Sequence, residues 1–110
     1  MAITHAAAGD LLDISPVGPS LAQSESGLLI RAEHLEVFRL VLPAGKRTPG
    51  HSAAGAITIQ CLEGRVELET EAGTQVMSPG TLVYLADAQP HAVEALEDAA
   101  LLITVLLRRA

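Results

Sequence analysis

The fold is decided by the stretch from Gly50 to His91, which contains two strand-like runs, Ala56-Ile57-Thr58-Ile59-Gln60-Cys61-Leu62 and Pro79-Gly80-Thr81-Leu82-Val83-Tyr84-Leu85. A turn at Glu63-Gly64 follows the first run. Each run has one histidine near it at a loop edge, His51 before the first and His91 after the second, forty residues apart. We expect the rest of the chain to be a scaffold that brings these two histidines together.

Outside this stretch, the chain is divided into short apolar runs separated by Gly, Pro and polar turns. One of them, Arg65 to Thr70, alternates strictly and predicts Val66 and Leu68 inside with Glu67 and Glu69 outside. About eight to ten strands at a spacing of roughly 8–12 residues are typical of a closed all-β sandwich or barrel. The other predicted strands are Leu28–Arg31, Leu35–Leu42, Gln75–Met77, Ala92–Leu96 and Ala99–Leu107. The last run would also suit a buried helix, but Ile103, Thr104 and Val105 favour a strand.

The 110 residues predict one barrel domain, residues 28–110, preceded by an arm, residues 1–27. The short apolar patch Leu11-Leu12-Asp13-Ile14 in the arm is interpreted as an edge strand, and Gly18-Pro19 as loop. The strands Leu35–Leu42 and Ala99–Leu107 carry more apolar surface than one barrel interior can take up, which predicts a homodimer.

Composition narrows the classes of partner. Thirteen acidic against seven basic residues give a net charge of −6, which disfavours nucleic acid and anionic membrane surfaces. Aromatic residues for stacking on bases are almost absent, and the longest apolar run has nine residues, against ~20 for a membrane span. A single cysteine, Cys61, and the lack of a leader pattern lead us to expect a cytoplasmic protein.

The central stretch resembles the cupin superfamily, the RmlC-like antiparallel jelly-roll β-barrels. The first cupin motif shows a Gly, a His-x-His pair, a Glu and a closing Gly; the second shows a Gly, Pro-x-Gly and a His. In this chain Gly64 matches the closing Gly of the first motif and His51 its first His. Gly80 and His91 match the ends of the second motif.

The resemblance also marks where this chain departs from the family. The second His falls on Ala53, the Glu on about Ile57, and the Pro and Gly of the second motif on Ala86 and Ala88. In cupins the three imidazoles and the carboxylate hold a divalent metal. Here only His51 and His91 remain as metal ligands, so we expect either no cofactor or a weakly bound divalent metal, with Zn, Ni, Fe and Mn not distinguished.

Strand parity names the other pocket candidates. Ile57, Ile59 and Cys61 share a face and are expected to line the barrel interior, with Gln60 pointing away. If the register is shifted by one residue, Gln60 becomes a polar group of the pocket instead. Tyr84 either reaches the pocket with its hydroxyl or packs in the core.

Three functions remain open, and the sequence does not decide whether the protein is an enzyme. The first is a binding module that holds a small, largely apolar ligand in the barrel, with His51 and His91 at its mouth. The second is a metal-dependent oxygenase or isomerase, as the resemblance allows. The third is a metal-free enzyme of the epimerase kind with a histidine as general base. The resemblance also implies a homodimer, because small cupins commonly pair through a sheet and an exchanged N-terminal strand.

Overall fold

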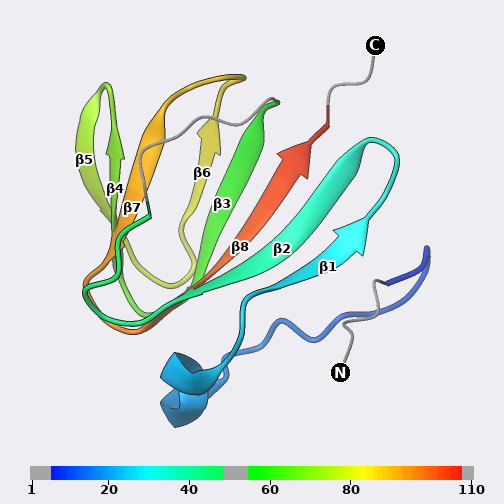
Figure 1. Ribbon diagram of the computed structural model, residues 1–110, viewed down its shortest axis with the longest axis horizontal. Helices are drawn as coiled ribbons and strands as arrows, with labels where there is room; N and C mark the ends of the chain where they lie inside the picture. The colour runs from blue at the N-terminus through cyan, green and yellow to red at the C-terminus, as the bar shows by residue number, and fades with distance from the viewer. Residues whose placement is uncertain (1–5, 49–54, 108–110) are drawn as a thin grey trace.

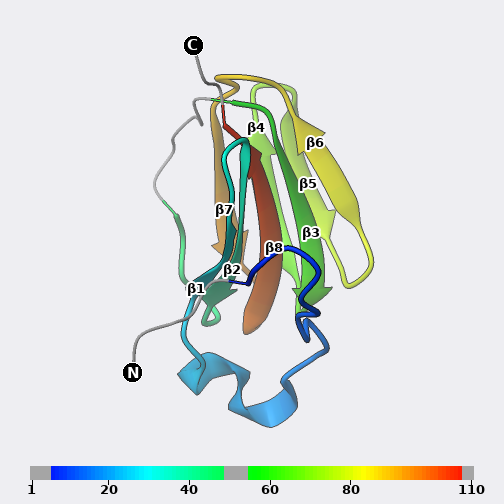
Figure 2. The same cartoon turned by 90° about the vertical axis from the view of Figure 1, so that its right-hand side faces the viewer.

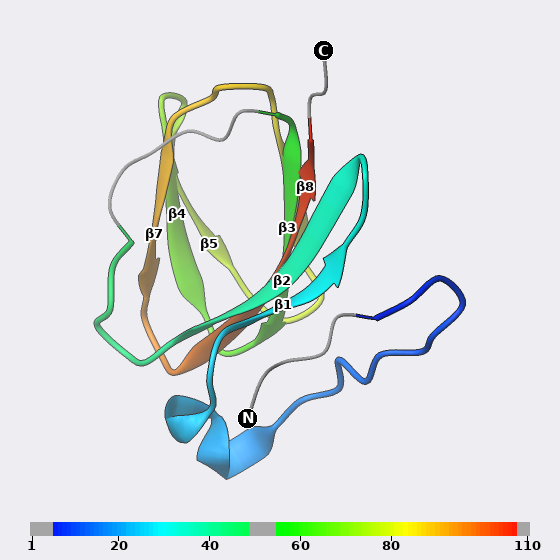
Figure 3. The same cartoon turned by 45° about the vertical axis from the view of Figure 1, so that its right-hand side comes forward.

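The computed structural model describes residues 6–48 and 55–107. Its strands form two antiparallel sheets, a five-stranded one in the order β1-β2-β8-β3-β6 and a three-stranded one in the order β5-β4-β7. Figure 1 shows the strands side by side, and Figure 3 shows the two sheets as facing walls of a sandwich. The elements are a 3-10 helix, η1 (Gly18–Gln23), and the strands β1 (Gly27–Arg31), β2 (Leu35–Leu42), β3 (Ile57–Glu63), β4 (Val66–Thr70), β5 (Gly73–Met77), β6 (Leu82–Leu85), β7 (His91–Ala95) and β8 (Ala99–Leu106).

Apolar and polar residues alternate along the strands as the sequence predicts, and the apolar side chains form the interior. In β4, Val66 and Leu68 are at most 1% exposed, whereas Glu67 and Glu69 face outward, so that prediction is confirmed. The unbroken apolar run after Glu97-Asp98 is a strand, β8, also as predicted. The inner faces of both sheets meet in one core, whose largest fully buried side chains are Ile59, Leu68, Leu101, Val66 and Cys61.

The second sheet is widened by the segment that leads toward His51. Gly45 N–H donates to Ala95 O, and Ala95 N–H donates to Lys46 O, both at 2.8 Å. Thr48 N–H donates to Val93 O at 2.8 Å, and the Thr48 hydroxyl accepts from Val93 N–H at 3.0 Å. This segment therefore runs along the free edge of β7, the strand that begins with His91.

The N-terminal arm covers the lower part of the outer face of the five-stranded sheet. Leu21 of η1 packs there with Val41 and Ala100 in a second, smaller apolar cluster. The Glu63 carboxylate fastens the arm by accepting hydrogen bonds from the backbone N–H groups of residues 17 and 18, at 2.6 and 3.0 Å. Figure 2 shows the beginning of the arm in front of β8 and β3, and η1 below the lower ends of the strands.

Two expectations for the arm are wrong. Residues 11–14 form no strand; it is Ala6, earlier in the arm, whose N–H donates to Leu29 O of the edge strand β1, at 3.0 Å. Gly18-Pro19 does not remain a loop but begins η1. Pro19 suits the first turn of a helix, where its missing N–H has no intrahelical partner to lose. In the part of the chain that the structure describes, no helix is long and apolar enough to cross a membrane.

Candidate ligand site

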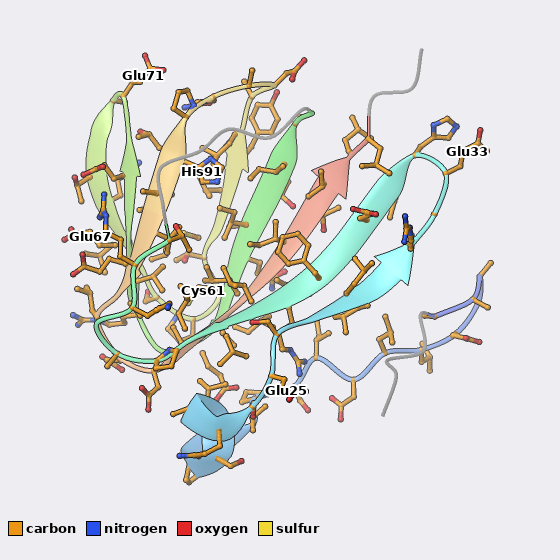
Figure 4. All side chains as sticks on the ribbon, viewed as in Figure 1. Glu25, Glu33, Cys61, Glu67, Glu71 and His91 are labelled. Carbon is orange, nitrogen blue, oxygen red and sulfur yellow. The ribbon has the colours of Figure 1, made fainter. Side chains whose placement is uncertain are left out.

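His91 is the polar side chain that the fold places inside the sandwich. It is the first residue of β7 and pairs with Thr70, the last residue of β4. Val93 and Ala95 of the same strand point into the core, so His91, two residues earlier, faces inward as well. Its side chain lies between the sheets near one end (Figure 4), and the residue is only 6% exposed.

The ring of His91 has a defined orientation. Its Nδ1 lies 3.3 Å from the carbonyl oxygen of Gln89. A carbonyl oxygen can only accept a hydrogen bond, so this contact favours the tautomer with the proton on Nδ1. In this tautomer Nε2 is the acceptor atom of the ring. A neutral histidine can use such a nitrogen to accept a proton from a ligand or to coordinate a metal.

The loop between β6 and β7 holds Gln89 in place. Gln89 N–H donates to Ala86 O at 3.1 Å, and the Gln89 side-chain oxygen accepts from Ala86 N–H at 2.9 Å. Between them, Ala88 has a left-handed backbone with φ of 61°. This is the conformation that favours glycine, and Ala88 is the position at which the cupin motif has its Gly. The local backbone therefore agrees with the alignment that places His91 on the motif histidine.

A shallow cavity of about 280 Å³ adjoins His91 at this end of β4 and β7. Arg47 lies near its rim and forms a 2.9 Å ion pair with Glu69, so that carboxylate is already partly neutralised. The cavity is lined by Glu69, Thr70, Glu71, Pro90, His91 and Ala92.

The deeper interior is filled by side chains. Ile57, Ile59 and Cys61 face inward as predicted, at 5%, 0% and 0% exposure, and all three belong to the main core. The Cys61 thiol lies 3.5 Å from the carbonyl oxygens of Glu63 and Gly64, at the turn after β3. Burial raises the pKa of this thiol, which keeps it protonated and makes it a poor metal ligand. That these three residues contact a ligand stays a prediction.

Two pocket candidates lie on the wrong side of the sheet. Tyr84 pairs with Thr58 on the outer face and is 66% exposed, so it neither reaches the interior nor packs in the core. Gln60 pairs with Leu82 on that same outer face. Both follow from Ile57 and Ile59 pointing inward, because neighbouring residues of a strand face opposite sides. The interpretation of Gln60 as a pocket group is therefore wrong, and its first interpretation, pointing away from the interior, is right.

The described residues do not fit a complete metal centre. Ile57, at the position that the resemblance assigns to the carboxylate ligand, is packed in the apolar core. Within residues 6–48 and 55–107, no group of three or more His, Cys, Asp or Glu side chains is arranged to hold a metal ion. His51, the second histidine of the predicted pair, lies outside the described residues, so the pairing itself stays a prediction.

No known family profile matches the sequence, and no curated protein does. The solved structures that superpose on this one include cupins, so the protein has the small antiparallel jelly-roll fold found in that superfamily. A cupin superfamily protein from Desulfitobacterium hafniense superposes with a TM-score of 0.74 at 14% identity, over 90% of this chain and 100% of that one. An RmlC-like cupin from Desulfovibrio desulfuricans gives 0.69 at 24%, over 93% and 97%.

The similar structures also include an enzyme. The DMSP lyase DddQ from Ruegeria pomeroyi superposes with a TM-score of 0.70 at 21% identity, over 88% of this chain and 55% of that one. At such identities the likeness concerns the fold alone. Function has to be argued from the residues of this chain.

Proposed function

We propose that the protein is a small-molecule-binding cupin that seats a small, largely apolar ligand at the rim beside His91. One observation carries the proposal: a histidine that is 6% exposed stands at the end of a core built otherwise from apolar side chains. A histidine ring nitrogen at the rim can donate or accept one hydrogen bond, which suits a ligand with one polar group. Pro90 and Ala92 in the lining of the cavity suit the apolar remainder of that ligand.

The size of the cavity limits the ligand. Sites for drug-sized molecules measure roughly 300–1,000 Å³, and the cavity beside His91, about 280 Å³, lies just below that range. It suits a single ring or a short chain. The fully buried side chains below it leave the ligand at the rim, rather than deep inside the barrel as the sequence suggested.

His51 is proposed as the second polar group at this rim. Thr48 is hydrogen-bonded to Val93, two residues from His91 on the same strand. His51 follows Thr48 by three residues, so the Cα atoms of His51 and Thr48 can be no more than about 11 Å apart. This short tether is what supports the pairing of the two imidazoles.

The proposal is tested with benzyl alcohol as the probe, a single apolar ring with one hydroxyl group. We expect it to shift the amide signals of His91 and Val93 in a two-dimensional NMR titration. Because one hydrogen bond contributes about 0.5–1.5 kcal/mol, His91→Ala should weaken the binding about threefold to tenfold. His34→Ala is the matched control, because the His34 side chain is exposed and its Nε2 lies 3.6 Å from the carboxylate of the neighbouring Glu33. Shifts confined to other regions, or equal affinity in both variants, would refute the proposal.

Metal analysis separates this function from the metal-dependent enzyme. A binding module of the proposed kind should be purified, without added metal, with far less than one metal ion per chain. Close to one ion per chain, lost in a double variant with His51→Ala and His91→Ala, would favour the oxygenase or isomerase instead. For the metal-free epimerase, the described contact of His91 Nδ1 is with a carbonyl oxygen rather than with an orienting carboxylate, and no observation favours that function.

A further inference from the structure

The cavity beside His91 is lined by charged groups, unlike the apolar core below it. Glu69 and Glu71 contribute two carboxylates to its wall, and Thr70, between them, contributes a hydroxyl. Figure 4 shows Glu71 at the same end of the sandwich as His91. In the part of the chain that the structure describes, the Glu71 carboxylate has no hydrogen-bond or ion-pair partner. This carboxylate is therefore available to a ligand.

The polar side chains of this lining act as hydrogen-bond acceptors. An ionised carboxylate has no proton to donate. The Thr70 hydroxyl is engaged within its own turn, where it donates to Gly73 O at 3.5 Å and accepts from Ala72 N–H at 3.2 Å. The contact of His91 Nδ1 with Gln89 O favours the tautomer in which Nε2 is an acceptor as well. The cavity therefore suits a ligand group that donates hydrogen bonds.

The guanidinium of Arg47 lies near this rim, but it does not neutralise the carboxylates. It is 2.9 Å from the Glu69 carboxylate and 3.7 Å from that of Glu94, so one positive charge is shared between two negative charges. With Glu71, three carboxylates stand against one guanidinium, which leaves an excess of two negative charges in this group. Such an excess attracts a cation and repels an anion.

We propose that the ligand of this cavity is a small organic cation, a protonated amine attached to one apolar ring or to a short apolar chain. This inference rests on the proposed function, because it specifies the polar group of the ligand bound beside His91. An ammonium group donates several hydrogen bonds and accepts none, which matches the acceptors of the lining. Its charge-assisted hydrogen bond to Glu71 is stronger than the bond that a neutral hydroxyl forms there. Pro90 and Ala92 face the apolar part of the ligand.

The exposure of Glu71 limits how strongly the cavity selects an amine. Glu71 lies in an exposed turn, and ion pairs at exposed positions are weak because water and salt screen them. We therefore expect an amine to bind about threefold to tenfold more tightly than a neutral analogue of the same size. The preference should shrink with added salt, since the Debye length falls from about 10 Å at 0.1 M to about 3 Å at 1 M.

Three probes with the same ring test the inference: benzylamine, benzyl alcohol and benzoate, which at pH 7 are positive, neutral and negative. Two-dimensional NMR titration of the full chain, followed at the amides of His91 and Val93, gives a dissociation constant for each. We expect benzylamine to bind most tightly and benzoate most weakly. Glu71→Gln should reduce the preference for benzylamine over benzyl alcohol to about twofold or less. Glu67→Gln is the matched control, because it makes the same change of charge outside the lining, about 10 Å along β4 from Thr70.

The outcomes separate this inference from the proposed function, and the same spectra show that each variant is folded. Benzyl alcohol that binds beside His91 as tightly as benzylamine overturns the inference and leaves the proposed function standing. If none of the probes shifts the signals near His91, both fail. A preference that persists in Glu71→Gln, or that Glu67→Gln removes equally, also overturns the inference, because the selecting charge would then lie elsewhere. Benzylamine that binds there while benzyl alcohol is too weak to detect supports it.

Discussion

Gly64 is the residue on which the alignment of the first cupin motif depends, and replacing it with alanine tests that alignment physically. It lies in the turn between β3 and β4 with φ of +71°. A Cβ atom built on it would lie 2.1 Å from the carbonyl oxygen of Asp98 and 2.9 Å from the Cα of Ala99. Both are backbone atoms at the start of β8, which cannot turn aside as the end of a flexible side chain can.

The expected cost of Gly64→Ala is the sum of three contributions. The left-handed backbone costs an alanine about 1–2 kcal/mol, and forcing the backbone of β8 away costs about 1–3 kcal/mol. The lower entropy of the unfolded chain returns about 0.4–1 kcal/mol. The net destabilisation is about 1–5 kcal/mol.

Gly80→Ala separates the clash from the backbone strain. Gly80, with φ of +90°, is the opening Gly of the second motif, and a Cβ built on it meets nothing within 4 Å. Gly80→Ala should therefore reduce the free energy of unfolding by only about 1 kcal/mol. This is the cost of the left-handed backbone for an alanine, less the gain from the lower entropy of the unfolded chain.

Urea unfolding followed by far-UV circular dichroism measures both changes in the free energy of unfolding. Equal losses for the two variants would show that the contact with Asp98 is not what demands a glycine. A loss below 1 kcal/mol for Gly64→Ala would remove the physical reason for reading residue 64 as the closing Gly. The placement of His51 on the motif, which is counted back from Gly64, would then lose its support.

Three further predictions concern other groups. Ala88→Gly should stabilise the fold by up to about 1 kcal/mol, because it relieves a left-handed alanine at φ of 61°, and a loss of stability in urea unfolding would contradict this. Cys61 should react with a thiol reagent at least tenfold more slowly in the native protein than in urea, since it is fully buried and burial raises its pKa; equal rates would show that it is accessible. Hydrogen bonds from the side chain and the backbone of Ser15 lower the pKa of Asp13. The contribution of these hydrogen bonds to the stability of the fold is therefore complete above the ordinary pKa of an aspartate, about 3.9. It is lost as the pH falls through the lower pKa that Asp13 has in the folded protein. The Ser15 amide signal should titrate with a midpoint below that value, and a midpoint above it would contradict the contact.

The strands could be predicted from the sequence because period-two alternation and turn residues are local signals. Val66 and Leu68 show this, since each is inward simply by alternating with a glutamate. Parity alone could not place Tyr84. Parity states which residues share a face but not which face points inward. Because the outer face of β6 is also apolar, Tyr84 could have pointed inward or outward.

The candidate site could be predicted only in part. The motif placed His91, and its burial between the sheets agrees with that placement. The cavity beside it is also lined by Glu69, Thr70 and Glu71, which come from another part of the chain and show no sequence signal of a site. No local signal relates the end of β4 to the start of β7, because their neighbourhood arises from pairing across the sheet. Similarly, η1 depends on contacts of Leu21 with distant strands.

Because Glu63 holds the arm through backbone groups, the positions that can change among homologous sequences differ between the arm and the sheet. Glu63 accepts hydrogen bonds from backbone N–H groups, which every residue except proline possesses. These hydrogen bonds therefore do not depend on the side chain at position 17, which is constrained by its packing alone. Homologous chains should therefore exchange many residues at that position while retaining an acidic residue at position 63. The attachment of the arm is inherited through one side chain of the sheet, whereas the arm itself is free to vary.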